Sequence, residues 1–325
     1  MANMTLFIVG MPRSGTKLLR DLLNQHSKIA IFPNETHFFP YLASIFDSFG
    51  DVTIESNFRK LYSEIINTTF YLRISKKGIS IQFEEFFNGV NESTLRSVLD
   101  SFFECYRNQT GKEVVGDKTP SYLTQIPMLS EVYPDAKYIH ICRDPRDYAI
   151  SINNAWNKNK LRAVQRWKNQ VSKFYADSKE SGIDCFNLKY EELLADPEQT
   201  LRDLFVFLGV EFEESVLSLT KPSENLGDTK GQTKIVKENF NKWKLDLSNS
   251  EIKSIENIAG SLMSSLGYEL QGSELGDNDL TALRMLWYKI EDVISLFKFH
   301  VIEEKGVIPA IKEIRRATMH SAVDE

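Results

Sequence analysis

An apolar run that leads directly into a glycine-containing loop and then a helix most limits how this chain can fold. Leu6–Val9 form the run, Gly10–Thr16 form the loop, and leucines at positions 18, 19, 22 and 23 give the next segment one apolar side. Backbone N–H groups converge where such a loop meets a helix N-terminus, and the helix dipole adds partial positive charge. Arg13 and Lys17 add full charges. The segment therefore predicts a phosphate-binding loop in an α/β fold.

The order of residues in this loop narrows the kind of phosphate ligand. A nucleoside-triphosphate loop places Lys directly after its second Gly, with a hydroxyl next to hold magnesium. Here Thr16 follows Gly15, and Lys17 comes only after it. The inverted order disfavours a site for ATP with magnesium. For the loop taken alone, an ordinary strand-to-helix turn is the alternative interpretation.

A second phosphate-binding segment is predicted near the middle of the chain. Residues 136–142 form an apolar run typical of a buried strand, Arg143 follows it, and Ser151 lies eight positions later on the next expected helix. Arg offers a planar fork of N–H donors, and Ser adds a hydroxyl to the same phosphate. In a kinase this strand normally ends in an Asp that holds magnesium. The alternative for Arg143 is an ion pair with Asp144 or Asp147.

Three further motifs occur in a fixed order around these two segments. They are Asn34–Phe39 with Glu35 and His37, Gly116–Pro120 with Lys118, and Phe186–Leu194 with Tyr190, followed by the closing segments Lys242–Trp243 and Gly267–Glu269. Together the motifs resemble those of sulfotransferases that use 3′-phosphoadenosine 5′-phosphosulfate (PAPS). The resemblance spans about residues 5–270 and depends on the order of the motifs more than on any single one.

The resemblance implies an α/β fold of the P-loop NTPase-like sulfotransferase type, a three-layer sandwich around a central parallel sheet. Strands are expected at 5–9, 28–32, 112–116, 137–142 and 184–190, alternating with helices, which is the pattern of such a sheet. The donor-binding residues implied are Arg13, Ser14, Gly15, Thr16 and Lys17 in the loop, Arg143 and Ser151 at the 3′-phosphate, Tyr190 at the adenine, and Lys234 and Lys237 in a covering loop.

Two of these assignments have alternatives. The family usually has a Thr or Ser where this chain has Lys17, so this lysine either holds the phosphate by its charge or turns outward. Lys234 and Lys237 lie in a polar, lysine-rich stretch at 221–243, which is equally typical of a solvated charge run.

The implied reaction moves a sulfuryl group from PAPS to a hydroxyl or amine of a small-molecule or carbohydrate acceptor and leaves 3′,5′-phosphoadenosine (PAP), without a metal. Glu35 resembles the general base of glycosaminoglycan and tyrosylprotein sulfotransferases, and His37 is the competing candidate. Arg13 and Lys118 would stabilise charge on the leaving phosphate. Burial near Phe38, Phe39 and Tyr41 is expected to raise the pKa of Glu35 toward neutrality. The alternative for Glu35 is an ion pair with Arg13 or Lys118.

The motifs and the hydrophobic pattern also predict the domain organisation. Residues 1–270 form the expected sulfotransferase domain, within which 40–111 are a helical insertion that forms part of the acceptor pocket, beside Phe38, Phe39 and Tyr41. Residues 271–325 form a helical C-terminal extension. One of its faces carries Leu283, Leu286, Trp287, Ile290, Val293, Ile294, Phe297 and Val301. This face is expected to pack on the core or to form a homo-oligomer, with a partner or membrane surface as the third alternative.

Composition excludes several other classes. The net charge of −6 disfavours a general basic surface for nucleic acid, and the three cysteines have no metal-binding spacing. No apolar run approaches the roughly 20 residues of a transmembrane helix, and the N-terminus lacks the basic start of a signal peptide. A cytoplasmic enzyme of bacterial type is therefore expected, acting on a small molecule or glycan.

Two other functions stay open. A P-loop nucleotide kinase would require ATP and magnesium. A non-catalytic nucleotide-binding protein would bind PAP without transferring a group, although the presence of both Glu35 and Lys118 argues against it. The sequence does not identify the acceptor.

Overall fold

The structure is a computed structural model that describes residues 4–223, 229–272 and 276–303, with the helical backbone alone for 296–303. Contacts divide the chain into two compact units. Unit 1 comprises residues 1–142, 174–223 and 233–235, and unit 2 comprises 143–173, 224–232 and 236–325. The domain boundary near residue 270 was drawn from sequence motifs and stays a prediction.

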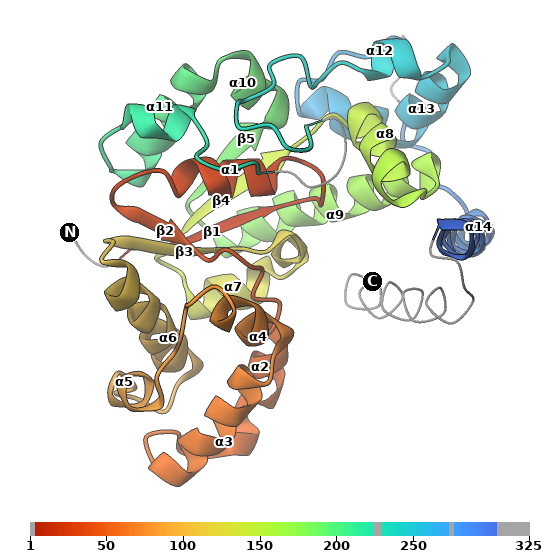
Figure 1. Cartoon of the computed structure of the whole chain (residues 1–325). Coiled ribbons are helices and arrows are strands. Elements are labelled where there is room, and N and C mark those ends of the chain that lie inside the picture. The colour runs from red at the N-terminus through yellow and green to blue at the C-terminus, as the bar shows by residue number, and fades with distance from the viewer. Residues whose placement is uncertain (1–3, 224–228, 273–275, 304–325) are drawn as a thin grey trace. The chain divides into compact units, whose positions relative to one another are not determined.

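Unit 1 contains a parallel sheet of five strands in the order β2-β3-β1-β4-β5 (Figure 1). The strands are β1 (Met4–Gly10), β2 (Ile29–Ile31), β3 (Val114–Lys118), β4 (Lys137–Cys142) and β5 (Cys185–Lys189). Each lies within two residues of its predicted place. In the β1–β3 register Ile8 lies opposite Lys118, so the loop after Gly10 and the segment after Lys118 leave the sheet at the same edge.

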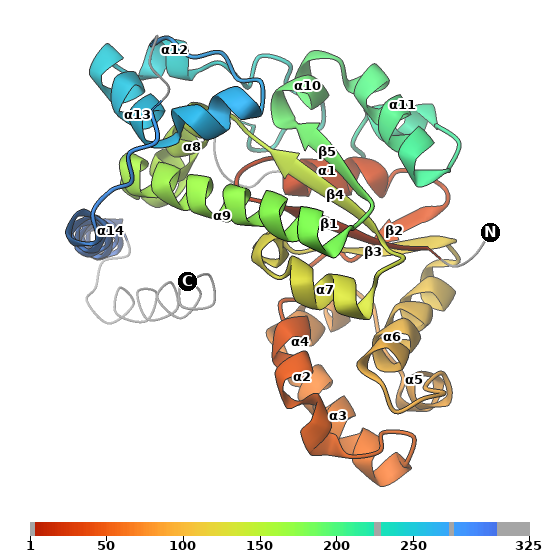
Figure 2. The ribbon, with the colours of Figure 1, turned by 180° about the vertical axis from the view of Figure 1, so that it is seen from behind.

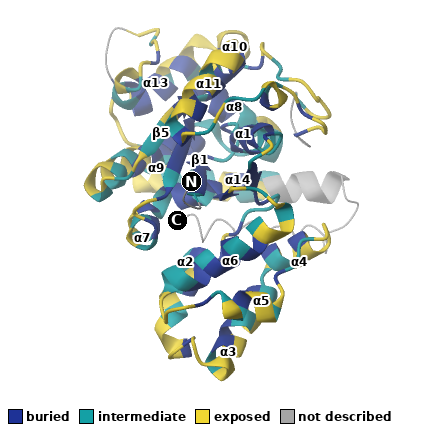
Figure 3. Ribbon diagram, turned by 90° about the vertical axis from the view of Figure 1, so that its left-hand side faces the viewer, coloured by how far each residue is buried: buried dark blue, intermediate teal, exposed yellow. Residues whose placement is uncertain are grey.

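Helices cover both faces of this sheet, which confirms the three-layer α/β fold. Helices α1 (Thr16–Leu23), α10 (Tyr190–Ala195) and α11 (Pro197–Leu208) lie on one side, and α6 (Leu95–Thr110) and α7 (Ile126–Val132) lie on the other (Figures 1 and 2). Phe7 of β1 packs its ring 6.1 Å from that of Phe103 and 5.4 Å from that of Tyr133. Because both faces are covered, β1 is apolar and buried along nearly its whole length (Figure 3).

The insertion between β2 and β3 is helical, as predicted. Besides α6 it contains α2 (Phe39–Ile45), the 3₁₀ turn η1 (Phe46–Phe49), α3 (Glu55–Ile66), α4 (Thr69–Ser75) and α5 (Phe83–Asn88). Phe38 and Phe39 are 6% and 0% exposed and pack their rings against Phe102, so the expectation that they line a pocket is wrong. The burial of two large aromatic side chains stabilises the core, and only Tyr41, which is 51% exposed, faces solvent there.

Shorter elements complete unit 1. The 3₁₀ turn η2 (Pro120–Thr124) follows β3, and η3 (Glu214–Leu217) follows α11.

Unit 2 consists of helices in its described part. They are α8 (Pro145–Trp156), the first half of α9 (Lys160–Ser181), α12 (Trp243–Asp246), α13 (Asn249–Ser265) and α14 (Ala282–Glu303). Ser248 and Glu251 form a capping box at the start of α13, which fixes where that helix begins.

The predicted C-terminal helix exists as α14, and one side of it is anchored within unit 2. The carboxylate of Asp292 accepts hydrogen bonds from the Arg162 side chain at 2.8 Å and from the Asn159 backbone at 2.6 Å. Its apolar side is largely exposed, with Leu283 at 80% and Trp287 at 66%. The side chains of Phe297 and Val301, which belong to the same predicted face, lie outside the described residues.

Candidate active site

The loop after β1 has the backbone geometry of a tight cradle. Gly15 caps the start of α1 at φ 92°, and a Cβ at this position would lie 2.4 Å from a ring carbon of Tyr190. Only glycine therefore fits, for its backbone angle and for its space. Arg13 also has a positive φ, 69°, which is a strained conformation for a residue with a side chain. Such strain is concentrated at functional loops.

The Ser14 side chain is the buried polar group of this loop that needs an explanation. Its side chain is 0% exposed, and its hydroxyl oxygen has no hydrogen-bond partner within the part of the chain that is described. A buried hydroxyl without a partner costs about 1–3 kcal/mol, so native structures rarely keep one without a reason. A ligand oxygen at the loop would satisfy it. Thr16, which starts α1, is likewise buried.

Lys17 turns toward the segment that contains Ser223. Its ammonium donates to the backbone carbonyl of Ser223, and the Ser223 hydroxyl in turn donates to Asp21 at 2.7 Å. The lysine therefore ties α1 to that segment. Its predicted contact with phosphate stays a prediction.

The structure brings Glu35, His37 and Lys118 together. The Lys118 ammonium donates to Oε1 of Glu35, and Nε2 of His37 lies 2.9 Å from Oε2. The Lys118 side chain is only 3% exposed, whereas Glu35 and His37 are 34% and 42% exposed. The Glu35 carboxylate is thus accessible to solvent, and the Lys118 ammonium pairs with it from the buried side. The ion pair with Lys118 is the alternative that the sequence left open for Glu35.

This pairing makes the predicted pKa shift of Glu35 wrong in sign. Burial alone would raise the pKa, but the hydrogen bond with His37 and the positive charge of Lys118 lower it to about 2. Burial in turn lowers the pKa of Lys118, and the Glu35 charge opposes that shift. Burial acts in the expected direction, but the expectation did not count the His37 hydrogen bond and the Lys118 charge, which together outweigh it.

Thr36 and Asp117, which the sequence analysis missed, support this cluster. The backbone N–H of Thr36 donates to the Thr119 hydroxyl at 3.0 Å and to Oδ1 of Asp117 at 3.3 Å, and the Thr36 hydroxyl lies 2.8 Å from that of Tyr122. Thr36 is therefore tied to the segment that carries Lys118. His37 follows it at φ 53°.

Asp117 is the least satisfied member of this network. It is 0% exposed, its Oδ2 has no partner among the described residues, and burial raises its pKa to about 6. A carboxylate inside an otherwise apolar strand, directly before Lys118, was the available sequence signal.

Unit 2 holds the residues predicted for the 3′-phosphate. Arg143 is 6% exposed and donates to the backbone carbonyl of Asn239 at 3.3 Å, while Ser151 is half-buried on α8. Asp144 pairs with Arg146 at 2.6 Å. Burial raises the pKa of Asp147, and the Arg143 charge opposes this, so an electrostatic link between those two residues remains.

The remaining predicted donor residues differ in burial. Tyr190 is 5% exposed and its ring lies against the loop at Gly15, whereas Lys234 and Lys237 are exposed. Gly227 of the same predicted covering loop lies outside the described residues. These three roles stay predictions.

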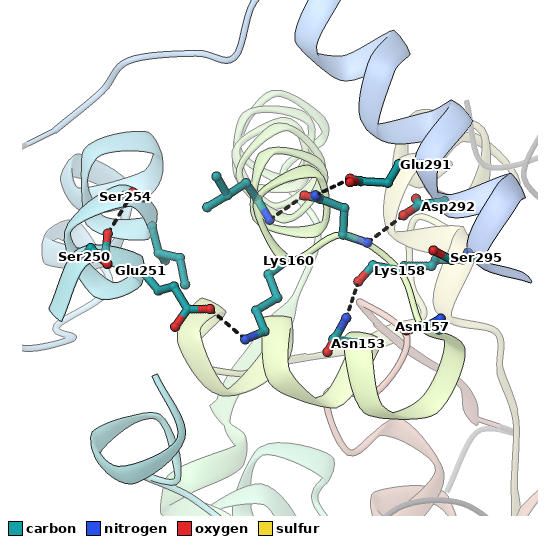
Figure 4. A pocket seen from close by; sticks show the side chains of 13 residues that line it. Asn153, Asn157, Lys158, Lys160, Ser250, Glu251, Ser254, Glu291, Asp292 and Ser295 are labelled. Atoms are coloured by element: carbon teal, nitrogen blue, oxygen red, sulfur yellow. Dashed lines mark hydrogen bonds and ion pairs between the residues drawn. The ribbon is translucent and has the colours of Figure 1, made fainter. Parts of the chain in front are cut away.

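A polar pocket of about 430 Å³ lies within unit 2, and none of the predicted residues lines it (Figure 4). Its carboxylates are already engaged: Glu251 pairs with Lys160 at 2.8 Å, and Glu291 accepts from the Asn159 side chain at 2.9 Å. The pocket therefore offers mostly neutral Asn and Ser groups.

The described residues contain neither a metal-binding cluster nor a helix that could cross a membrane. No group of three or more His, Cys, Asp or Glu side chains is arranged to hold a metal ion. Among the same residues no helix combines the length and apolar character needed to cross a membrane.

Comparison with known proteins gives one consistent result. The model of the sulfotransferase family matches residues 5–214. The nodulation protein NoeE of Sinorhizobium fredii is 29% identical over 150 residues, which are 46% of this chain and 31% of that protein. The protein-tyrosine sulfotransferase of Drosophila melanogaster is 24% identical over 316 residues, which are 87% of this chain and 57% of that protein. The chain thus spans between a third and somewhat more than half of these relatives.

Solved structures show the same fold. The sulfotransferase domain from the curacin biosynthetic pathway matches with a TM-score of 0.54 at 20% identity, covering 83% of this chain and 99% of that domain. The sulfotransferase domain from the Synechococcus PCC 7002 olefin synthase matches with a TM-score of 0.53 at 23% identity, covering 83% and 96%. With the family match over residues 5–214, this chain belongs to the sulfotransferase family of enzymes.

Proposed function

We propose that the protein transfers a sulfuryl group from PAPS to a hydroxyl or amine of a small-molecule or carbohydrate acceptor. The observation that carries the proposal is the pair of the buried Lys118 and the partly exposed Glu35, at the sheet edge from which the phosphate-binding loop also departs. Sulfuryl transfer needs a cation for the leaving phosphate and a proton acceptor for the hydroxyl. The pair supplies both.

The residues around the loop suit the donor. Ser14 offers a buried hydroxyl that has no partner among the described residues, and Gly15 and Thr16 offer backbone N–H groups at the start of α1. Arg143 and Ser151 would hold the 3′-phosphate. The three finer assignments, which are Tyr190 at the adenine and Lys234 and Lys237 over the donor, belong to the same proposal.

The chemistry of Glu35 follows from its partners. The donor, when bound, supplies an activated sulfuryl group with PAP as its leaving group. Lys118 and Arg13 stabilise the negative charge that builds on the leaving phosphate. As Lys118 turns toward that charge it withdraws from Glu35, and the pKa of the carboxylate rises from its low resting value. Glu35 thus becomes a better base at the stage when the acceptor proton leaves. His37 orients the carboxylate, or takes the proton in its place.

Titration calorimetry with PAP, followed by transfer of labelled sulfate from PAPS to a panel of phenols, sugars and a tyrosine peptide, tests the proposal. Arg143→Ala should weaken PAP binding by at least tenfold, because a charge-assisted phosphate contact is lost. Glu35→Gln should keep PAP binding and slow turnover by about 10²–10⁴, as expected for loss of a general base. Equal loss of PAP binding in both variants contradicts the roles. Binding of ATP with magnesium in preference to PAP would favour the kinase instead.

The assembly and location remain predictions as well. The exposed Leu286 (55%) and Trp287 (66%) support a homo-oligomer formed through α14. Light scattering of the wild type and of Trp287→Glu tests it, since a charge in the interface should yield monomers. The cytoplasmic location stays a prediction.

A further inference from the structure

We propose that Lys77, with Arg20 beside it, forms a subsite for an anionic group of the acceptor, so that the acceptor is a hydroxyl compound carrying a carboxylate or a phosphate-like group. The inference rests on the proposed sulfuryl transfer and narrows its substrate class.

Arg20 and Lys77 both approach the backbone carbonyl oxygen of Pro33. Nη1 of Arg20 donates to the backbone carbonyl of Pro33 at 2.9 Å, and Nζ of Lys77 approaches the same oxygen at 3.4 Å. Two cations from distant parts of the chain therefore converge on one oxygen. Pro33 lies two residues before Glu35, so this oxygen is close along the backbone to the proposed base.

The charges around this point do not balance. Arg20 pairs with Asp21 at 2.5 Å, and Lys118 pairs with Glu35. Within the described part of the chain, no carboxylate forms an ion pair with Lys17, Arg73 or Lys77, and all three cations lie near enough to interact electrostatically.

Burial and the neighbouring cations act on Lys77 in the same direction. Burial lowers the pKa of Lys77, and the charges of Arg20, Lys17 and Arg73 lower it further, while only Asp21 opposes them. A surplus of like charges is unfavourable until an anion arrives. An anion that binds at this cluster would therefore be attracted by the cations, and it would reduce the repulsion among them.

The origin of Lys77 places the anion on the acceptor side. Lys77 follows α4 in the helical insertion, whereas the residues proposed for the donor phosphates lie in the loop at 13–17, just before α8 (Arg143) and on α8 (Ser151). Lys17 belongs to the loop proposed for the donor, whereas Lys77 belongs to the helical insertion, which was predicted to form part of the acceptor pocket. An acceptor that binds Lys77 through its anion can present its hydroxyl to Glu35, because the Pro33 carbonyl and Glu35 belong to one short segment.

Lys77→Gln tests the subsite, with Lys76→Gln as the matched control. Lys76 is the neighbouring exposed residue that directly follows α4, and it makes no ion pair among the described residues. Three phenols serve as probes: 4-hydroxyphenylacetate, its neutral amide, and 4-hydroxybenzylphosphonate. For the wild type we expect kcat/KM to be about tenfold higher for an anionic phenol than for the amide. The carboxylate and phosphonate arms show which anion the subsite prefers.

Lys77→Gln should raise KM for the anionic phenols by about fivefold to tenfold and leave kcat, the amide and PAP affinity unchanged. Added salt should reduce the wild-type preference, because the contact is partly exposed and screened. Lys76→Gln should behave as wild type. Equal use of charged and neutral phenols, or equal effects of the two substitutions, would overturn the subsite.

A binding measurement separates this inference from the proposed function. Calorimetry of the PAP-saturated protein with 4-hydroxyphenylacetate needs no turnover. Weaker binding by Lys77→Gln but not by Lys76→Gln supports the subsite even where no sulfate is transferred, and then only the proposed reaction fails. No binding, or equal binding by all three proteins, overturns the subsite even where transfer to other acceptors is observed.

Discussion

Two clusters of cations and carboxylates, one in each unit, are built in opposite ways. In unit 2 the guanidinium of Arg146 binds Asp144 at 2.6 Å and Glu256 at 2.8 Å, and lies 3.6 Å from the ring centre of Trp243. All three charged side chains are nearly buried, at 2% and 6% exposed. In unit 1 the buried Lys118 holds a carboxylate that is 34% exposed, next to an under-satisfied Asp117.

The difference separates a structural cluster from a reactive one. Around Arg146 every carboxylate has a cation, and Glu256 also accepts backbone N–H groups of Gln271 and Gly272, both at 3.0 Å. Among the described residues, the three charged groups of this cluster are therefore all paired with one another. Around Lys118 one carboxylate is reachable and one buried carboxyl keeps a bare oxygen within the described residues. Groups held at unfavourable protonation states are characteristic of functional sites.

The largest expected effect comes from breaking the unit 2 cluster. Arg146→Ala leaves Asp144 and Glu256 buried without their cation, so the free energy of unfolding should fall by about 3–5 kcal/mol in urea titrations. Lys28→Ala is the control, because its pair with Glu113 is 42% and 56% exposed and should be worth less than about 1 kcal/mol. A loss as small as the control's would mean that Arg146 is not structural.

This contrast also shows what the sequence could predict. The strands and the insertion follow from hydrophobic periodicity, which depends on near neighbours, and were placed within a few residues. The motifs likewise identified Glu35 and Lys118 as members of one site. Their spacing in sequence could not show that the two form an ion pair, and so the pKa of Glu35 was predicted with the wrong sign.

Arg143 and Arg146 also show that local sequence does not identify ion-pair partners. Arg143 precedes α8 and Arg146 lies in its first turn, three positions later, and local sequence does not tell which is structural. The partner that decides it, Glu256, lies 110 residues further along the chain. The prediction that Phe38 and Phe39 line a pocket was wrong for the same reason, since their packing partners come from α6.

The second prediction concerns Asp117 and the pH dependence of stability. Its folded pKa of about 6 lies above the unfolded value of 3.8, so the folded state holds the proton more tightly. Its contribution is therefore complete below pH 3.8 and is lost as the pH rises through 6, by about 3 kcal/mol in total. Asp117→Asn removes this slope. Urea titrations at several pH values should show the variant gaining on the wild type between pH 4 and 6.5, and parallel curves would refute the assignment.

The third prediction tests the hold of Lys118 on Glu35. Lys118→Met keeps most of the side-chain volume but removes the charge, so the pKa of Glu35 should rise from about 2 by about one unit or more, while the hydrogen bond from His37 remains. Carbon NMR of labelled Glu carboxyls measures it. An unchanged pKa would mean that His37 alone sets the value.

The smallest effect on stability is expected at Ser14, in the loop after β1. Its substitution tests whether a buried polar group without a partner serves binding or stability. Its buried hydroxyl has no partner in the described structure, so Ser14→Ala should change the free energy of unfolding by less than about 0.5 kcal/mol or raise it slightly. The same change should weaken PAP binding about fivefold to tenfold, because a hydrogen bond to a charged phosphate is lost.

Ser101→Ala is the matched control for a satisfied hydroxyl. Ser101 is also buried, but its hydroxyl donates to the Phe86 carbonyl at 2.6 Å, so its loss should cost about 1 kcal/mol of stability and leave PAP binding unchanged. The two substitutions should therefore give opposite patterns in urea titration and calorimetry. If Ser14→Ala lost stability and kept PAP affinity, the loop hydroxyl would belong to the scaffold, as Arg146 does, and would have no part in holding the donor.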